Sequence, residues 1–361
     1  DHPIIAKEEN QDEACYRQFY EEAISLCRKK RFHEVLEKCR YTSLDDEEEY
    51  SIDVIQPEKI EFKQNSYEDG ENSIISFPEF LLLVLDVCTG GEQPASHYQP
   101  DKLIEKFNAL KTHFTAGEFY EKMLYYRLLL DYYTIRRDIK DGQGNYSLIL
   151  KGPKDDNDKL KQYQSMLYVS TEAFYNWLKP YLRKLEQDEL QSCAEMLAFL
   201  KKEDNERHGV LPSRKDLSYK ASGNIRYWFW RLDYYLWEQR STFFNEEEQK
   251  IVEHYVFRRN RSIEHLHPQD ESHNEEWEEE AVHSFGNLAM ISQSFNSQQS
   301  NDHIQIKFAR IHEQISNKSL QSIKMFLMCK LADFNYQNWT MKLAKEHEDK
   351  MIELLKQSYV C

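Results

Sequence analysis

Apolar residues recur with helical spacing along most of the chain. Between residues 13 and 40 they follow one helical period and predict a single helix. Ser76, Pro78 and Glu79 form a helix start, because serine can cap the helix and glutamate stands at its third position. The run that follows is so apolar that it predicts a helix buried on all sides.

The same periodicity predicts further helices at residues 101–114, 117–138, 158–169, 171–186, 188–203, 221–239, 246–258, 300–316, 319–332 and 335–357. A short strand is predicted at 146–150. The polar stretch from Glu203 to Arg214 contains a glycine and a proline and marks a candidate domain boundary. We therefore expect a helical region at 1–210 and a second domain at 211–361.

Composition agrees with a mostly helical, globular chain. Of 361 residues, 40% are hydrophobic and 30% are charged, while Gly (10) and Pro (9) are scarce. The net charge of −16 restricts any contact with nucleic acid to a local basic surface.

The seven cysteines are scattered and form no Cys-x-x-Cys motif, which argues against a disulfide framework and a structural zinc site. Reduced thiols indicate a cytoplasmic protein. No apolar run reaches the roughly 18–20 residues that a membrane span needs, so we expect no membrane partner.

Polar residues gather around two short apolar segments near the C-terminal third. Ile263 and Leu266 flank the pair Glu264-His265, and Asn287 begins the apolar run 288–291. Asn296 then opens a helical segment. Two strands and a helix make a ββα unit in which the histidine and both asparagines are available to converge.

These residue types suit phosphodiester hydrolysis. A histidine can take a proton from water near neutral pH. A divalent cation such as Mg²⁺ prefers hard oxygen ligands, which a glutamate carboxylate and an asparagine amide provide.

Three segments and one lysine resemble the C-terminal HNH (His-Me finger) nuclease domain of GmrSD-type (type IV) restriction proteins. Ssp-type defence proteins share this domain. The residues are Ser262–Gln269, Phe285–Ile291, Phe295–Ser297 and Lys307. The resemblance covers about residues 216–361 and extends more weakly upstream. It implies a mostly α fold with an embedded ββα-metal element.

The resemblance also implies site roles. His265 matches the general base, and Asn287 matches the middle asparagine, which orients the base or braces the fold. Glu264 and Asn296 match metal ligands for Mg²⁺ or Mn²⁺, and Lys307 matches a trailing basic residue that could hold phosphate. The wider superfamily often has aspartate where Glu264 stands, so coordination through water is an alternative.

The family's nucleotidase domain carries an Asp-Gly-Gln-Gln-Arg motif. Residues 141–145 read Asp-Gly-Gln-Gly-Asn, lack the arginine and predict a turn. We therefore expect that this chain lacks the nucleotidase domain, that residues 1–210 are a helical spacer, and that a full-length parent has a nucleotidase domain or subunit.

Basic residues cluster around the motif. Arg258, Arg259 and Arg261 precede it, and Lys307 and Arg310 follow it. They are candidates for contact with the DNA backbone, although ordinary helix surface explains each one alone. His267, His273 and His283 form no regular zinc-ligand spacing.

The sequence thus predicts a metal-dependent DNA endonuclease or nickase module of a restriction or anti-phage defence protein, acting on foreign or modified DNA. Two alternatives stay open: a non-catalytic helical binding module with a degenerate nuclease site, and RNA cleavage at the same site. The sequence leaves the oligomeric state and the recognised modification open.

Overall fold

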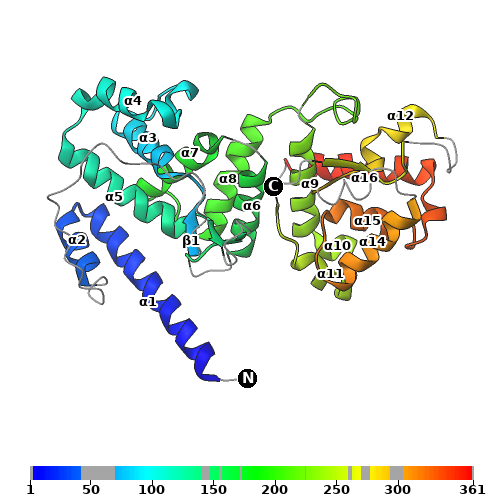
Figure 1. The fold of residues 1–361 in the computed structure, drawn as a ribbon, viewed down its shortest axis with the longest axis horizontal. Coiled ribbons are helices and arrows are strands. Elements are labelled where there is room, and N and C mark those ends of the chain that lie inside the picture. The colour runs from blue at the N-terminus through cyan, green and yellow to red at the C-terminus, as the bar shows by residue number, and fades with distance from the viewer. Residues whose placement is uncertain are drawn as a thin grey trace, which may run out of the picture. The chain divides into compact units, whose positions relative to one another are not determined.

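A computed structural model describes residues 3–41, 70–139, 146–153, 157–170, 173–223, 225–258, 262–269, 277–292 and 304–359. The chain is mostly helical, which confirms the predicted fold class at this level (Figure 1). None of the described helices combines the length and apolar character that a bilayer crossing requires. The predicted turn at 141–145 lies outside the described residues.

The chain divides into two compact units. Unit 1 comprises residues 1–161 and 173–196, and unit 2 comprises residues 162–172 and 197–361. Unit 1 contains α1 (Pro3–Arg28), α2 (Phe32–Tyr41), β1 (Gly70–Ser73), α3 (Phe77–Cys88), α4 (Leu103–Leu110), α5 (Ala116–Tyr133), β2 (Arg136–Ile139), β3 (Tyr146–Ile149) and α7 (Phe174–Glu186). Short 3₁₀ turns occupy Ala95–His97, Pro100–Lys102 and Lys111–His113. Helices α6 (Asp158–Val169) and α8 (Cys193–Arg207) contribute residues to both units.

The single helix predicted at 13–40 is wrong: the segment forms α1 and α2, with a break between them. At the break Lys30 has a φ of 57°, in the left-handed region that interrupts a right-handed helix. Two other local predictions, a helix start at Ser76 and a strand at 146–150, are confirmed. Ser76 caps α3 in a capping box with Glu79, and the strand predicted at 146–150 is β3, which pairs antiparallel with β2.

Unit 2 contains α9 (Arg226–Glu238), α10 (Arg240–Phe243), α11 (Glu246–Glu253), β4 (Ser262–His265), α12 (Glu279–Val282), β5 (Leu288–Ile291), α14 (Ile304–Ser316), α15 (Ile323–Leu331) and α16 (Met341–Gln357), with 3₁₀ turns η4 (Phe285–Asn287) and η5 (Tyr336–Asn338). Strand β4 pairs antiparallel with β5, and His265 lies opposite Leu288.

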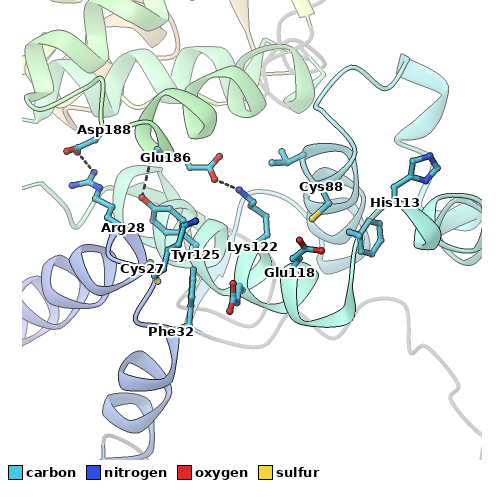
Figure 2. Close-up of a pocket in the computed structure, with 14 residues that line it drawn as sticks. Cys27, Arg28, Phe32, Cys88, His113, Glu118, Lys122, Tyr125, Glu186 and Asp188 are labelled. Carbon is cyan, nitrogen blue, oxygen red and sulfur yellow. Dashed lines mark hydrogen bonds and ion pairs between the residues drawn. The ribbon is translucent and has the colours of Figure 1, made fainter.

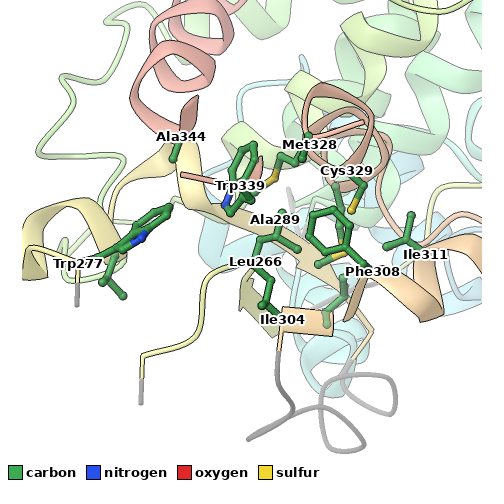
Figure 3. Close-up of a cluster of buried hydrophobic side chains, with 14 residues drawn as sticks. Leu266, Trp277, Ala289, Ile304, Phe308, Ile311, Met328, Cys329, Trp339 and Ala344 are labelled. Atoms are coloured by element: carbon green, nitrogen blue, oxygen red, sulfur yellow. The ribbon is translucent and has the colours of Figure 1, made fainter. Parts of the chain in front are cut away.

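A buried apolar cluster packs the strand pair against the helices that follow it (Figure 3). Ala289 comes from β5 and Leu266 directly follows β4, while Phe308 comes from α14 and Met328 from α15. Trp339, just before α16, lies in the same cluster. The two apolar segments that predicted these strands therefore lie in the core of unit 2, and all four residues of β5 are buried.

Two further contacts fix α16. The guanidinium of Arg231 on α9 is fully buried, contacts Asp204 at 3.0 Å and donates to the carbonyl of Ser358, just beyond α16. At η4, a Cβ added to Gly286 would lie 2.1 Å from the carbonyl oxygen of Ala344 on α16. The helix backbone therefore approaches η4 closely enough that only glycine fits.

Candidate functional site

The site is built at the end of β4, where the chain leaves the sheet. Glu264 and His265 are the last two residues of β4 and both are 5% exposed. Beyond the strand, the Leu266 amide donates to the Asn287 carbonyl at 2.9 Å. The pairing of β4 with β5 therefore brings the end of β4, with Glu264 and His265, next to Asn287.

The imidazole of His265 contacts a second histidine. Its Nε2 lies 3.1 Å from Nδ1 of His283, and the Gln269 side-chain amide donates to its Nδ1 at 2.9 Å. Burial lowers the pKa of His265 to about 3, with contributions from the neighbouring His283 and Lys307. His265 is therefore neutral at physiological pH. The Gln269 nitrogen lies closer to Nδ1 than to Nε2, at 2.9 Å against 3.3 Å, and this contact corresponds to the tautomer that carries its proton on Nε2, facing His283.

Tyr219 stands at the entrance to this histidine pair. Its ring lies 4.6 Å from the His265 ring, edge to face, and stacks on His283 at 5.7 Å. The His283 carbonyl accepts hydrogen bonds from the Tyr219 amide and from the Ser218 hydroxyl. Tyr219 is 43% exposed, so it forms the boundary between the histidine pair and solvent.

Glu264 is paired with a buried lysine of α14. The Lys307 ammonium, only 4% exposed, forms an ion pair with the Glu264 carboxylate and donates to the His265 carbonyl at 2.6 Å. Lys307 therefore lies inside the site and links α14 to the end of β4. It is not a surface group of the kind that the DNA-backbone prediction requires.

Asn287 is fully engaged within the protein. Its amide nitrogen donates to the carbonyls of His267 and Val282, and its amide oxygen accepts from the His267 amide and the Trp339 indole. Four hydrogen bonds use the whole capacity of the side chain. This geometry corresponds to the bracing role rather than to direct contact with a substrate.

The described donor atoms do not by themselves fit a divalent metal. Glu264 already contacts the Lys307 ammonium, and no group of three or more His, Cys, Asp or Glu side chains with metal-binding geometry occurs among the described residues. Asn296, the other predicted ligand, lies outside those residues. The ring of His267 stacks on Trp277 at 4.1 Å.

The structure describes three of the five predicted basic residues, and Lys307 among them is buried. Arg258 is exposed, whereas Arg310 on α14 is half-buried. Arg259 and Arg261 lie outside the described residues. Lys324, near the same motif, is fully buried and donates to the carbonyls of Phe285 and Leu288, so it supports β5 from inside.

Unit 1 has a separate cavity of about 800 Å³, between residues of α1, α2, α3, α5 and α7 (Figure 2). Lys122 forms an ion pair with Glu186, and Arg28 contacts Asp188 at 2.7 Å. These two pairs neutralise four of the charged groups that line the cavity.

Residues 212–354 match the sequence model of one family, described as GmrSD restriction endonucleases, C-terminal domain. The match lies wholly within unit 2 and covers less than half of the chain. No curated protein and no solved structure matches the chain. The C-terminal part of this chain, residues 212–354, is therefore a GmrSD-type C-terminal domain.

Proposed function

We propose that unit 2 is an HNH-type nuclease that hydrolyses phosphodiester bonds in DNA, as an endonuclease or nickase of a restriction system directed at foreign or modified DNA. The observation that carries the proposal is a neutral, buried His265 at the end of a strand pair, next to the Glu264–Lys307 ion pair, within the restriction-endonuclease match.

In this mechanism Nδ1 of His265 is the base that takes a proton from the attacking water. The Gln269 amide contacts this nitrogen, so water reaches it when Gln269 turns away. As His265 becomes an imidazolium, its Nε2–H keeps donating to neutral His283, which disperses the new charge. His283 is thus a positioning residue, and Asn287 holds the loop that carries Gln269 by bonding His267.

The low pKa of His265 makes it a weak base in the free protein. A phosphodiester monoanion beside the ring favours the imidazolium and raises this pKa. The positive charge of Lys307 lowers the pKa of His265, and the ion pair of Lys307 with Glu264 reduces this lowering. Substrate binding therefore strengthens the base where it is needed.

Dependence on Mg²⁺ or Mn²⁺ belongs to the proposal through Glu264 and Asn296. Since Glu264 is paired with Lys307, we derive no reaction step through a metal. Nicking measured with Mg²⁺, with Mn²⁺ and with a chelator tests this part separately.

The test of the proposal is cleavage of supercoiled plasmid. We expect the wild type to nick the plasmid and His265→Ala to reduce the rate at least about 100-fold, the usual contribution of a general base. The matched control is His254→Ala, an exposed histidine after α11. Equal rates for the wild type and His265→Ala, with both folded by circular dichroism, would reject the base.

A non-catalytic binding module is the second candidate. It is favoured by the complete internal hydrogen bonding of Asn287 and by the pairing of Glu264 with Lys307. It predicts no nicking under any metal condition and no heat of Mg²⁺ or Mn²⁺ binding by calorimetry.

A further inference from the structure

A groove of about 800 Å³ opens beside the histidine pair in unit 2. Ser218 and Ser284 line it, and these residues flank Tyr219 and His283 in the chain. The Ser218 hydroxyl donates to the His283 carbonyl at 3.2 Å. The groove and the His265 site therefore share one wall.

The groove gathers several basic side chains in an otherwise acidic chain. Five basic side chains line it: Arg214, Lys215, Lys220, Lys342 and Lys345. Three carboxylates line it as well, at Glu278, Glu280 and Glu348. Carboxylates outside the lining pair with three of these basic groups, at Glu279, Glu346 and Asp349, so the charge open to a ligand lies on the unpaired lysines. Lysines gathered in one groove attract a polyanion to it.

The basic residues come from two segments that face each other across the groove. Arg214, Lys215 and Lys220 belong to the segment between α8 and α9, whereas Lys342 and Lys345 stand three residues apart on one face of α16. Lys215 and Lys345 are exposed, and neither forms an ion pair with any described residue. Their charges are therefore open to an incoming phosphate.

Acidic residues of α12 already counter part of this charge. Lys220 forms an ion pair with Glu279, and Glu278 and Glu280 line the groove on either side of it in the chain. On α16, Glu348 pairs with Arg214 at 2.8 Å and Asp349 pairs with it as well, and Lys342 lies 3.8 Å from Glu346. The Glu279 carboxylate therefore occupies the position next to the Lys220 ammonium that a phosphate of the DNA would take.

We propose that this groove binds the sugar-phosphate backbone of the DNA strand that enters the His265 site, and that Glu279 competes with phosphate for Lys220. The inference rests on the proposed nuclease function. It adds to that function a groove that binds the DNA backbone and a glutamate, Glu279, that competes with the DNA phosphates for Lys220. A volume of about 800 Å³ accommodates a short stretch of one strand.

The test is fluorescence anisotropy of a labelled DNA oligonucleotide with the full chain in chelator, so that cleavage does not interfere. We expect Lys215→Glu combined with Lys345→Glu to weaken binding at least about tenfold. The slope of log K against log salt should shrink by about two, roughly one per lost phosphate contact. Glu279→Gln should bind about two- to threefold tighter than the wild type, because a competitor is removed.

Lys250→Glu is the matched control, since Lys250 is exposed on α11 and does not line the groove. If the double reversal does not fold, Lys215→Gln with Lys345→Gln carries the same test. Binding within twofold of the wild type in the folded double variant would overturn the groove, as would weaker binding by Glu279→Gln. Tighter binding of an RNA of the same sequence would overturn the assignment to DNA.

Failure of the groove and failure of the nuclease proposal are distinguishable. If the wild type nicks plasmid but the groove variants bind and cleave normally, only the groove is rejected. If no protein nicks plasmid but the double reversal still loses affinity, the groove stands as a DNA-binding surface and the hydrolytic function is rejected.

Discussion

Lys307 contributes one buried positive charge that serves two acceptors, the Glu264 carboxylate and the His265 carbonyl. Lys307→Met would leave the Glu264 carboxylate buried without its counter-ion. Removing one partner of a buried pair usually costs about 3–5 kcal/mol. We expect a loss of that size in the free energy of unfolding, measured with urea.

The double variant Glu264→Gln, Lys307→Met should recover most of this loss, because no uncompensated charge remains. Lys250→Met, at an exposed position, should change stability by less than about 0.5 kcal/mol. A single variant as stable as the wild type would show that the carboxylate does not depend on Lys307.

The pH dependence of stability follows from His265, whose pKa falls from its ordinary value near 6.5 to about 3 on folding. Between these values the unfolded chain binds a proton that the folded chain does not. Stability is therefore complete above about pH 6.5 and declines as the pH falls towards 3. From pH 7.5 to pH 5, we expect the wild type to lose about 2 kcal/mol more than His265→Gln does.

Urea unfolding of both proteins at the two pH values measures this difference. Burial also lowers the pKa of His347, which both proteins keep, so its contribution cancels in the comparison. His283 contacts the side chain at position 265, so the measured difference belongs to the histidine pair as a unit. Parallel pH profiles would mean that His265 binds a proton equally in both states.

Among the elements, α16 depends on a single glycine of η4. Gly286→Ala would place a Cβ 2.1 Å from the Ala344 carbonyl and 2.9 Å from the Glu348 Cβ. Overpacking typically costs about 1–3 kcal/mol, and a clash with backbone lies at the upper end. We expect a clear fall in melting temperature, measured by circular dichroism.

Gly223→Ala is the control, because a Cβ at Gly223 meets nothing within 4 Å. Nicking by Gly286→Ala should fall together with its stability, since Glu348 of α16 also pairs with Arg214 in the basic groove. A Gly286→Ala protein that melts like the wild type would show that α16 can move away without cost.

At the scale of the whole molecule, the sequence predicts the helical class and the pairing of β4 with β5. It does so because the apolar pattern follows burial closely. The break between α1 and α2 escapes prediction because Lys30 adopts a left-handed conformation that lysine does not signal. The pattern of apolar side chains predicts which face of a helix is buried, but it does not predict the residue at which the helix ends.

The candidate site likewise has residues that the sequence pattern predicts and residues that it does not. Glu264, His265 and Asn287 are predictable since they stand at the ends of paired strands. Tyr219 and His283 are not, because packing between distant loops brings them to His265. The burial of Lys307 did have a signal, in that Ile304 and Ile311 stand one helical turn before and after it on the buried face of α14.

The distribution of charge also belongs to this scale. The sequence gives a net charge of −16 and basic residues near the motif, but several of those are buried, half-buried or outside the described residues. The basic groove is instead assembled from the segment before α9 and from α16, which are far apart in the chain. Only folding brings these charges together.

The close contact at Gly286 changes how the Phe-Gly-Asn segment is understood. Its glycine is required by a helix that begins 55 residues later, at Met341, and its asparagine is used up in holding a loop. A search for distant relatives that relies on this tripeptide would therefore retrieve proteins that keep the docked C-terminal helix, including ones that have lost the histidine. Recognition of active members should rest on Glu264-His265, where the chemistry is proposed.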